Sequence, residues 1–490
     1  MADKRKLGVV RRGLIALGSL MFSAACATIS STPDAPSVAP NARAQAAQQH
    51  PQIVAQFGGA VEGPLASYVS TIGERTATAA GVPGQCTFTV INSDVVNAFA
   101  VPGCYIYITR GILAVMNSED ELASVLGHEV GHVVADHSAQ RQNASTLSTI
   151  GALIVGVATG SGELAQLAGQ AAQLYTLNYS REQEFQSDDL GVRYLRANGY
   201  NQYASADMLG ALGAQDALQA RINNRDAASA IPAWARTHPL SADRVARANA
   251  QAQAGGAVRG QPPEIVQPYM NAINGMIFGD DPEQGFVNGR TFAHPVMRIA
   301  FEAPEGFTLT NTTTAVVAQG PTGQGQFGGG GALGQNTLES YATSGLRQLL
   351  GQAPHQLGQV QRTNVNGLET VIAPARAQNS QGQILDVAVT AYRVGDRAYH
   401  FITIAPQNQG AAVNAMARSV RQLSAAEAGA LRARRIEIVT VRAGDTVQSL
   451  SRRMAFDTYQ EDRFRAINGL DAAGTLRAGD RVKIVTYAPR

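Results

Sequence analysis

The stretch His128-Glu129-Val130-Gly131-His132 decides how this chain is interpreted, because it is an H-E-x-x-H motif. It lies in a helical pattern that starts at Ser118, and Ser118 with Glu121 three residues later predicts a capping box there. Two histidines four residues apart stand on one face of a helix, so both imidazoles can reach one metal ion. Glu129 projects beside them, where it can act as a general base towards water. We therefore predict a catalytic site that binds one Zn2+ per chain.

A catalytic zinc takes three protein ligands and keeps one position open. Glu184 is the best candidate for the third ligand, because it begins the sequence Glu184-Phe185-Gln186-Ser187-Asp188. This spacing places both carboxylates on one face of a second helix. Glu184 would then bind the metal, while Asp188 would accept a hydrogen bond from the outer ring nitrogen of a histidine. By position, Asp189 is an alternative to Asp188.

His137 lies five residues after His132 and could be mistaken for a ligand. On a straight helix that offset turns its side chain roughly 140° away from the metal-binding face. We therefore expect His137 to have a surface or capping role.

The first 27 residues have the pattern of an export signal, with a basic start and an apolar run over residues 14–25. The run is too short to span a bilayer as a permanent helix. Ser23-Ala24-Ala25-Cys26 resembles a bacterial lipobox, in which Cys26 is acylated. Cleavage after Ala27 at an A-x-A site and an uncleaved anchor are the alternatives. We expect a periplasmic protein anchored to the outer membrane as a lipoprotein, touching the membrane through that anchor only.

Removing the leader takes away five basic residues and one acidic residue, which changes the formal charge from +2 to −2. This balance does not suit a nucleic-acid-binding protein, and we expect no nucleic acid partner. Two cysteines remain, Cys86 and Cys104, each at the start of an alternating, strand-like stretch. In an oxidising compartment they can form a disulfide, and two buried free thiols are the alternative.

Composition and periodicity predict an α+β multidomain chain. We expect the glycine-rich stretch 320–334 to be a mobile surface loop. The predicted units are a flexible linker at 28–50, a mainly helical domain at 51–255, a linker at 256–289, an α+β domain of unknown role at 290–425, and a small last domain at 436–488.

Further motifs accompany the first two in a fixed order. They are Asn97-Ala98-Phe99-Ala100, Asp136-His137, Tyr179-Ser180-Arg181-Glu182-Gln183-Glu184 with Asp188 and Gly191, and Thr237-His238-Pro239 with Arg244. With these motifs, residues 51 to 250 resemble the HtpX and BepA type of zinc metallopeptidase, a family that also contains the CAAX prenyl protease.

The resemblance implies a zincin-like (gluzincin) fold in which His128, His132 and Glu184 hold zinc, Asp188 supports them and Glu129 is the general base. His238 would either donate a hydrogen bond to the oxyanion or close the fourth zinc position in a resting state. Arg244 would orient this loop or a nearby carboxylate. The strand that begins at residues 97–100 would hold an extended substrate by main-chain hydrogen bonds, and a plain core hairpin is the alternative.

The last domain resembles a LysM module, a small βααβ unit that binds glycans containing N-acetylglucosamine. The resemblance rests on residues 441–447, 467–470 and 476–484. It implies peptidoglycan as a partner, and a degenerate spacer or docking module is the alternative.

Together these features predict a zinc endopeptidase of the bacterial envelope that degrades misfolded or stalled envelope proteins. A latent or non-cleaving, chaperone-like scaffold associated with peptidoglycan is the first alternative. A cell-wall hydrolase is the second, and the peptidase motifs argue against it.

Overall fold

The computed structural model describes residues 37–137, 179–222, 238, 242–259, 263–312, 315–379 and 381–489. Cys26 and the rest of the predicted export signal lie outside these residues. Within the described ranges, no helix combines the length and the apolar character needed to cross a membrane.

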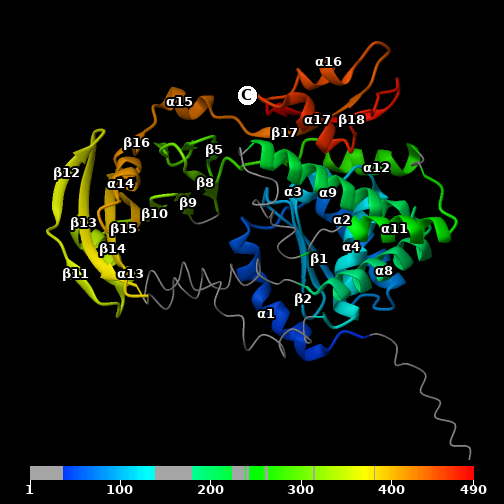
Figure 1. Cartoon of the computed structure of the whole chain (residues 1–490), viewed down its shortest axis with the longest axis horizontal. Helices are drawn as coiled ribbons and strands as arrows, with labels where there is room; N and C mark the ends of the chain where they lie inside the picture. Colours follow the sequence, from blue (N-terminus) through cyan, green and yellow to red (C-terminus); the bar gives the residue numbers. More distant parts are fainter. Residues whose placement is uncertain are drawn as a thin grey trace, which may run out of the picture. The chain divides into compact units, whose positions relative to one another are not determined.

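The first part of the chain is built on a mixed sheet of β1 (Thr87–Ile91), β3 (Tyr105–Thr109) and β2 (Ala98–Val101), in that order. β1 runs parallel to β3, and β2 runs antiparallel to it. Because side chains alternate along a strand, Phe99 faces helix α1 (Pro40–Gln56) while Ala98 and Ala100 face the main core. That core lies under α2 (Pro64–Ala79) and α4 (Glu119–Val134), so helices cover both faces of the sheet (Figure 1).

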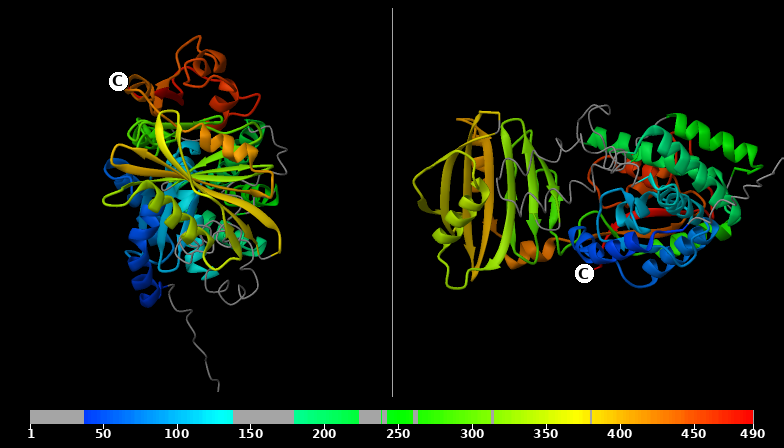
Figure 2. Two further views of the ribbon diagram at one scale, coloured as in Figure 1. Left: turned by 90° about the vertical axis from the view of Figure 1, so that its left-hand side faces the viewer. Right: turned by 90° about the horizontal axis from the view of Figure 1, so that it is seen from below.

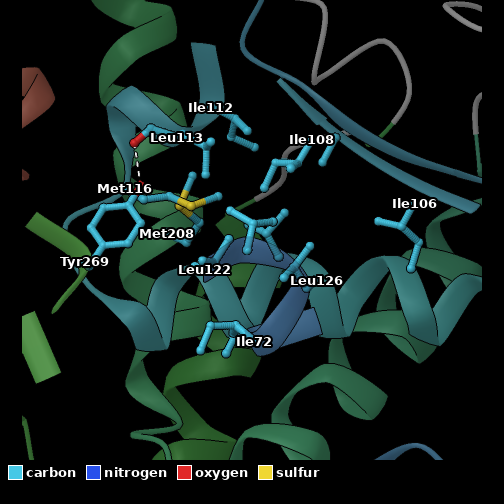
Figure 3. Close-up of a cluster of buried hydrophobic side chains, with 14 of the residues drawn as sticks. Ile72, Ile106, Ile108, Ile112, Leu113, Met116, Leu122, Leu126, Met208 and Tyr269 are labelled. Carbon is cyan, nitrogen blue, oxygen red and sulfur yellow. Dashed lines mark hydrogen bonds between the residues drawn. The ribbon is translucent and has the colours of Figure 1, made fainter. Parts of the chain in front are cut away.

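Helix α4 carries the H-E-x-x-H motif through the middle of this core. Leu122 and Leu126 lie on one face of α4 and pack in a cluster with Ile72 of α2 and Met208 of α9 (Tyr203–Ile222) (Figure 3). At its start, the Ser118 hydroxyl accepts a hydrogen bond from the backbone N–H of Glu121, as its sequence predicts. The other half of the predicted capping box differs, because the Glu121 carboxylate accepts from the backbone N–H of Asn117.

Small residues allow α4 to pack closely against α8 (Arg181–Ala197). A Cβ atom added to Gly127 would lie 3.3 Å from the Cα atom of Gly191. One added to Gly131 would lie 3.2 Å from the carbonyl oxygen of Ser187. This close approach brings the acidic face of α8 to the histidine face of α4.

The two expected linkers contain regular structure, which corrects those predictions. Residues 40–50 belong to α1, whose side chains pack on the sheet, so the linker predicted at 28–50 does not reach residue 50. Residues 256–289 contain α12 (Pro263–Ile273), β4 (Ile277–Phe278) and β5 (Phe286–Asn288). The described residues of this part also form α3 (Arg110–Val115) and α11 (Ala242–Ala254).

The middle part contains a twisted antiparallel sheet with strand order β11-β13-β14-β15-β10-β9-β8, and β12 also pairs with β13 (Figure 2). Helices α13 and α14 pack on its opposite faces, through separate clusters of buried residues. The strands are β8 (Thr308–Asn311), β9 (Ala315–Gly320), β10 (Gly323–Ala332), β11 (His355–Leu357), β12 (Gln361–Val365), β13 (Leu368–Gln378), β14 (Ile384–Val394) and β15 (Arg397–Pro406). The helices are α13 (Leu338–Leu350) and α14 (Ala411–Arg418), and α15 (Ala425–Ala430) follows them. A smaller sheet has the order β16-β7-β6-β5, with β6 (Thr291–His294), β7 (Ile299–Glu302) and β16 (Arg421–Gln422).

The prediction of a mobile loop at residues 320–334 is wrong, because strand β10 occupies most of this stretch between β9 and β15. The missing side chains make room for neighbouring rings. A Cβ atom added to Gly325 would lie 2.6 Å from the ring of Phe401, and one added to Gly330 would lie 2.9 Å from the ring of Tyr399. The glycines here permit packing and do not prevent it.

The last part has the order β17 (Arg434–Thr440), α16 (Val447–Ser451), α17 (Gln460–Ile467) and β18 (Arg481–Tyr487). This is the βααβ order that the sequence predicts, with β17 and β18 paired antiparallel. Strand β4 adds a third strand beside β17, so the sheet includes a segment from far earlier in the chain.

Candidate metal centre

The two histidines of the H-E-x-x-H motif are buried and point at one another from successive turns of α4. The Nε2 atoms of His128 and His132 lie 3.0 Å apart, and their side chains are 7% and 1% exposed. Glu184 of α8 approaches the same point, with its carboxylate oxygens 3.5 Å from His128 Nε2 and 3.4 Å from His132 Nε2. The structure therefore brings these three predicted ligands together.

His238 joins this group from a segment more than 100 residues after α4. Its Nδ1 atom lies 3.2 Å from His128 Nε2 and 3.0 Å from Glu184 Oε1. One ligand atom from each of these residues and from His132 lies within 4.8 Å of all the others. Four buried donors, three of them imidazoles, form a set that a transition metal ion can bind.

Asp188 and Arg244 support the group from behind. Asp188 Oδ1 accepts a hydrogen bond from His128 Nδ1 at 3.0 Å, which directs His128 Nε2 inward. Arg244 donates from Nε and Nη2 to Asp188 at 2.7 and 2.8 Å, and its Nη1 lies 2.7 Å from Glu184 Oε2. Burial acts to raise the pKa of Asp188, but hydrogen bonds from Arg244 and His128 outweigh it and lower that pKa. Asp189, the alternative partner, forms an ion pair with Arg247 at the surface instead.

His137 is fully buried, which corrects the expectation of a surface role. Helix α4 ends at Val134, and Asp136 has a positive φ of 51°, so the chain turns back towards the site. The Nδ1 atoms of His137 and His132 lie 2.9 Å apart, and His137 Nε2 contacts the Oε1 atom of Gln186 at 3.0 Å. A straight-helix projection misses this contact. The adjoining Asp136-His137 pair was the signal that could have revealed it.

Tyr179 also contributes to the site from a position with no predicted role of its own. Its ring stacks on the imidazole of His132 with centroids 3.5 Å apart and an angle of 16° between the planes. Together with His137, this stacking fixes the orientation of the His132 ring.

Glu129 lies fully buried beside the donors. Its Oε1 atom is 3.4 Å from His238 Nε2. Burial raises the pKa of Glu129, while the charges of His238 and His128 act against that rise. A carboxylate with a raised pKa next to a metal site is suited to accepting a proton.

Residues 97–100, the predicted substrate strand, lie next to Glu129. Ala98 to Ala100 belong to β2, which the order β1-β3-β2 leaves at the edge of its sheet among the described strands. The backbone of Ala100 lies close enough to the Glu129 carboxylate to act against the rise of its pKa. Asn97 precedes the strand and is tied to Thr109, whose hydroxyl donates to the Asn97 carbonyl oxygen at 2.8 Å.

Cys86 and Cys104 form a disulfide at the start of β1 and β3. The backbone N–H of Thr87 donates to the carbonyl oxygen of Cys104 at 2.8 Å, so the bridge continues the pairing of the two parallel strands. The covalent link and the sheet hydrogen bonds fasten the same end of the sheet.

The buried donor group is a candidate metal centre, and residues 65–252, which contain it, match the family model of Peptidase family M48. The beta-barrel assembly-enhancing protease of Yersinia pestis is 28% identical over 230 residues, which are 44% of this chain and 45% of that protein. The mitochondrial metalloendopeptidase OMA1 of Schizosaccharomyces pombe is 28% identical over 184 residues, which are 37% of this chain and 51% of that protein. The chain thus spans about half the length of these relatives. Among solved structures, PsbP of Synechocystis sp. PCC 6803 aligns with 28% of this chain and 98% of its own, at 10% identity and a TM-score of 0.23.

Proposed function

We propose that this chain is a zinc-dependent endopeptidase of the bacterial cell envelope, in which His128, His132 and Glu184 hold one zinc ion. The observation that carries the proposal is the buried arrangement of these three donors beside Glu129. A catalytic zinc site commonly has this ligand set, in which two imidazoles and a carboxylate bind the metal and a fourth coordination position stays open.

The distances between donor atoms fit this metal. Zinc with ligands at about 2.0–2.1 Å in tetrahedral geometry needs donor atoms roughly 3.3 Å apart. The separations are 3.0 Å between the two Nε2 atoms and 3.4 and 3.5 Å from these atoms to Glu184. Because His128 Nδ1 donates to Asp188, His128 Nε2 carries no proton and directs a lone pair inward. The lone pairs of the closely spaced donor atoms repel one another, and a cation bound between them relieves this repulsion.

When bound, zinc polarises the scissile carbonyl and makes a nearby water more acidic. Glu129 takes a proton from the attacking water and then passes it to the leaving amine. Its raised pKa suits both steps, because the protonated acid remains available as a donor. Strand β2, adjoining Glu129, offers its main chain to an extended peptide, and this pairing would align the scissile bond with the base.

His238 supports a second candidate, a latent form of the same site. Its Nδ1 atom stands among the other donors, where it would close the position that substrate needs. We assign His238 to this resting arrangement. Movement of His238 would open the site, and its ring could then donate to the oxyanion.

The names of the relatives suggest the biological role. One relative is named a beta-barrel assembly-enhancing protease and another a metalloendopeptidase, which supports proteolysis connected with the assembly of envelope proteins. We propose misfolded or stalled envelope proteins as substrates, a periplasmic location with a lipid anchor at Cys26, and peptidoglycan as a partner of residues 436–488.

Casein degradation tests the catalytic part of the proposal. The purified chain should cleave casein, and it should stop after chelation and recover when zinc is restored. Glu129→Gln should bind zinc stoichiometrically without cleaving, whereas Glu182→Gln, an exposed position on α8, should behave as wild type.

Cleavage by Glu129→Gln at the wild-type rate would contradict the assigned base. If wild type and both variants each bind one zinc ion per chain but none of them cleaves casein, the latent scaffold is favoured.

A further inference from the structure

Lys483 of strand β18 is completely buried against a segment more than 360 residues earlier in the chain. Its Nζ atom donates to the carbonyl oxygens of Ala114 at 2.9 Å and Met116 at 2.5 Å, and it lies 3.4 Å from that of Val115. These carbonyls are at the carboxyl end of helix α3. A buried ammonium group is costly unless polar groups replace its water, and here backbone oxygens do so.

Helix α3 needs such partners, because no backbone N–H group within the helix donates to its last carbonyl oxygens. Its six residues are also too few to be stable alone. The hydroxyl of Tyr269 on α12 donates to the Leu113 carbonyl oxygen at 2.5 Å (Figure 3). Tyr269 and Lys483 together therefore satisfy the end of α3 from two later parts of the chain.

The segment held in this way joins strand β3 to the metal-binding helix. After α3, the chain passes through Asn117 to the start of α4 at Ser118. The backbone N–H of Asn117 donates to the carboxylate of Glu121 at 2.8 Å, which continues the support into the first turn of α4. His128 lies about two turns further along the same rigid helix.

Other contacts also join residues 434–487 to earlier segments. The backbone of Ile436 pairs with Gly275 and Met276 beside β4, and exposed side-chain pairs add weaker links. Arg481 on the same strand as Lys483 donates to Asn271 at 2.8 Å, and Arg221 pairs with Asp462 at 3.0 Å, both at exposed positions. Exposed pairs of this type contribute about 0–1 kcal/mol. Lys483 differs because its removal leaves several buried acceptors without a donor.

We propose that Lys483 is a positioning residue, through which residues 434–487 hold the α3–α4 junction and thereby the metal-binding helix. The last domain then acts as a structural part of the peptidase, in addition to any glycan it binds. The inference that the junction is held by Lys483 stands on geometry alone. Its consequence for the metal site rests on the proposed function.

Amine labelling tests the docking directly, because Lys4, Lys6 and Lys483 are the lysines of the whole chain. The full chain is acetylated briefly, digested after arginine and analysed by mass spectrometry. The variant Arg481→Lys supplies a partly exposed lysine on the same strand as an internal control. We expect Lys483 to react at least 100-fold more slowly than the lysine introduced by Arg481→Lys, and equally fast in urea. Equal reaction rates in the folded chain would overturn the proposal.

Zinc retention tests the effect on the metal site. Lys483→Met should lose zinc to a chelator at least 10-fold faster than wild type and should lower kcat for fluorescent casein with little change in KM. Tyr269→Phe, which removes the other donor without creating a large cavity, should show a smaller effect in the same direction. Arg481→Met, the matched control, should stay within twofold of wild type.

If Lys483→Met folds, and both it and Tyr269→Phe lose zinc at the same rate as wild type, the positioning role is refuted. If Lys483→Met does not fold, Tyr269→Phe decides between the two results. Failure of the proposed function would look different, since wild type itself would then neither hold zinc nor cleave casein, while labelling would still report on docking.

Discussion

Replacing Arg244 tests how the metal centre is held, because this side chain joins two of its acidic residues. Arg244 is 1% exposed and makes two short hydrogen bonds to Asp188 and a 2.7 Å contact with Glu184. Arg244→Met leaves both carboxylates buried without their cation. Breaking a buried ion pair from one side costs about 3–5 kcal/mol. We expect the free energy of unfolding to fall by this amount.

The same change should weaken zinc binding. Asp188 orients His128, and residues that orient metal ligands typically affect metal affinity by about 10–100-fold. Arg244→Lys keeps the charge but loses the planar fork that reaches both oxygens of Asp188, so an intermediate loss is expected. Urea unfolding measures the stability, and competition with a chromogenic chelator measures the affinity.

Arg247 provides a matched control on the same helix. It forms a similar fork with Asp189 of α8, but the two side chains are 46% and 35% exposed. Arg247→Met should cost less than about 1 kcal/mol and leave zinc affinity unchanged. Equal losses in Arg244→Met and Arg247→Met would refute the reasoning, because burial would then not be the deciding factor.

Three further predictions concern separate features. His238→Ala should raise casein cleavage by opening the site; a fall of about 100-fold would instead assign His238 to the oxyanion. The double variant Cys86→Ser with Cys104→Ser should lower the free energy of unfolding by about 3 kcal/mol in urea titrations, since the bridge closes a short loop; no change would show a strained or absent bridge. Burial lowers the pKa of Lys483 to about 7, while the charge of Glu121 acts against that shift, so the unfolded chain holds the extra proton between pH 7 and the ordinary lysine value of 10.5. In that window the free energy of unfolding of wild type, measured relative to that of Lys483→Met, should rise by up to about 1.4 kcal/mol per pH unit. If the free energies of unfolding of the two proteins change in parallel with pH, the amine is not buried as described.

The sequence was most informative where a local pattern and the chemistry coincide. His128, Glu129 and His132 lie within two turns of one helix, so helical spacing alone brings them together. The approach of Glu184 depends on packing between two helices. Its spacing to Asp188 nevertheless predicted which face would be used. Ser118 could be placed at the start of α4 because capping depends on neighbours in the chain.

Predictions based on composition were less successful. The glycines of β10 indicate flexibility when counted, but Gly325 lies against Phe401 because a side chain would not fit there. Whether a glycine serves a turn or a close packing contact depends on its tertiary neighbours. The same reason explains why the alanine- and glutamine-rich composition of residues 40–50 predicts a linker although these residues form a helix. Their helix is retained by packing on the sheet, which no local pattern reveals.

The residues that support the metal helix were harder to predict than the ligands, and their positions explain why. At its carboxyl end α4 is followed by a turn at Asp136, after which His137 folds back to His132. At its amino end the junction with α3 is held by Tyr269 and Lys483. Both supports begin where the helical periodicity stops, so spacing carries no information about them. A helix that carries a candidate metal centre and is fixed from outside at both ends can keep short, repulsive contacts between its histidines ready for a cation, which a freely fraying helix of the same sequence could not do.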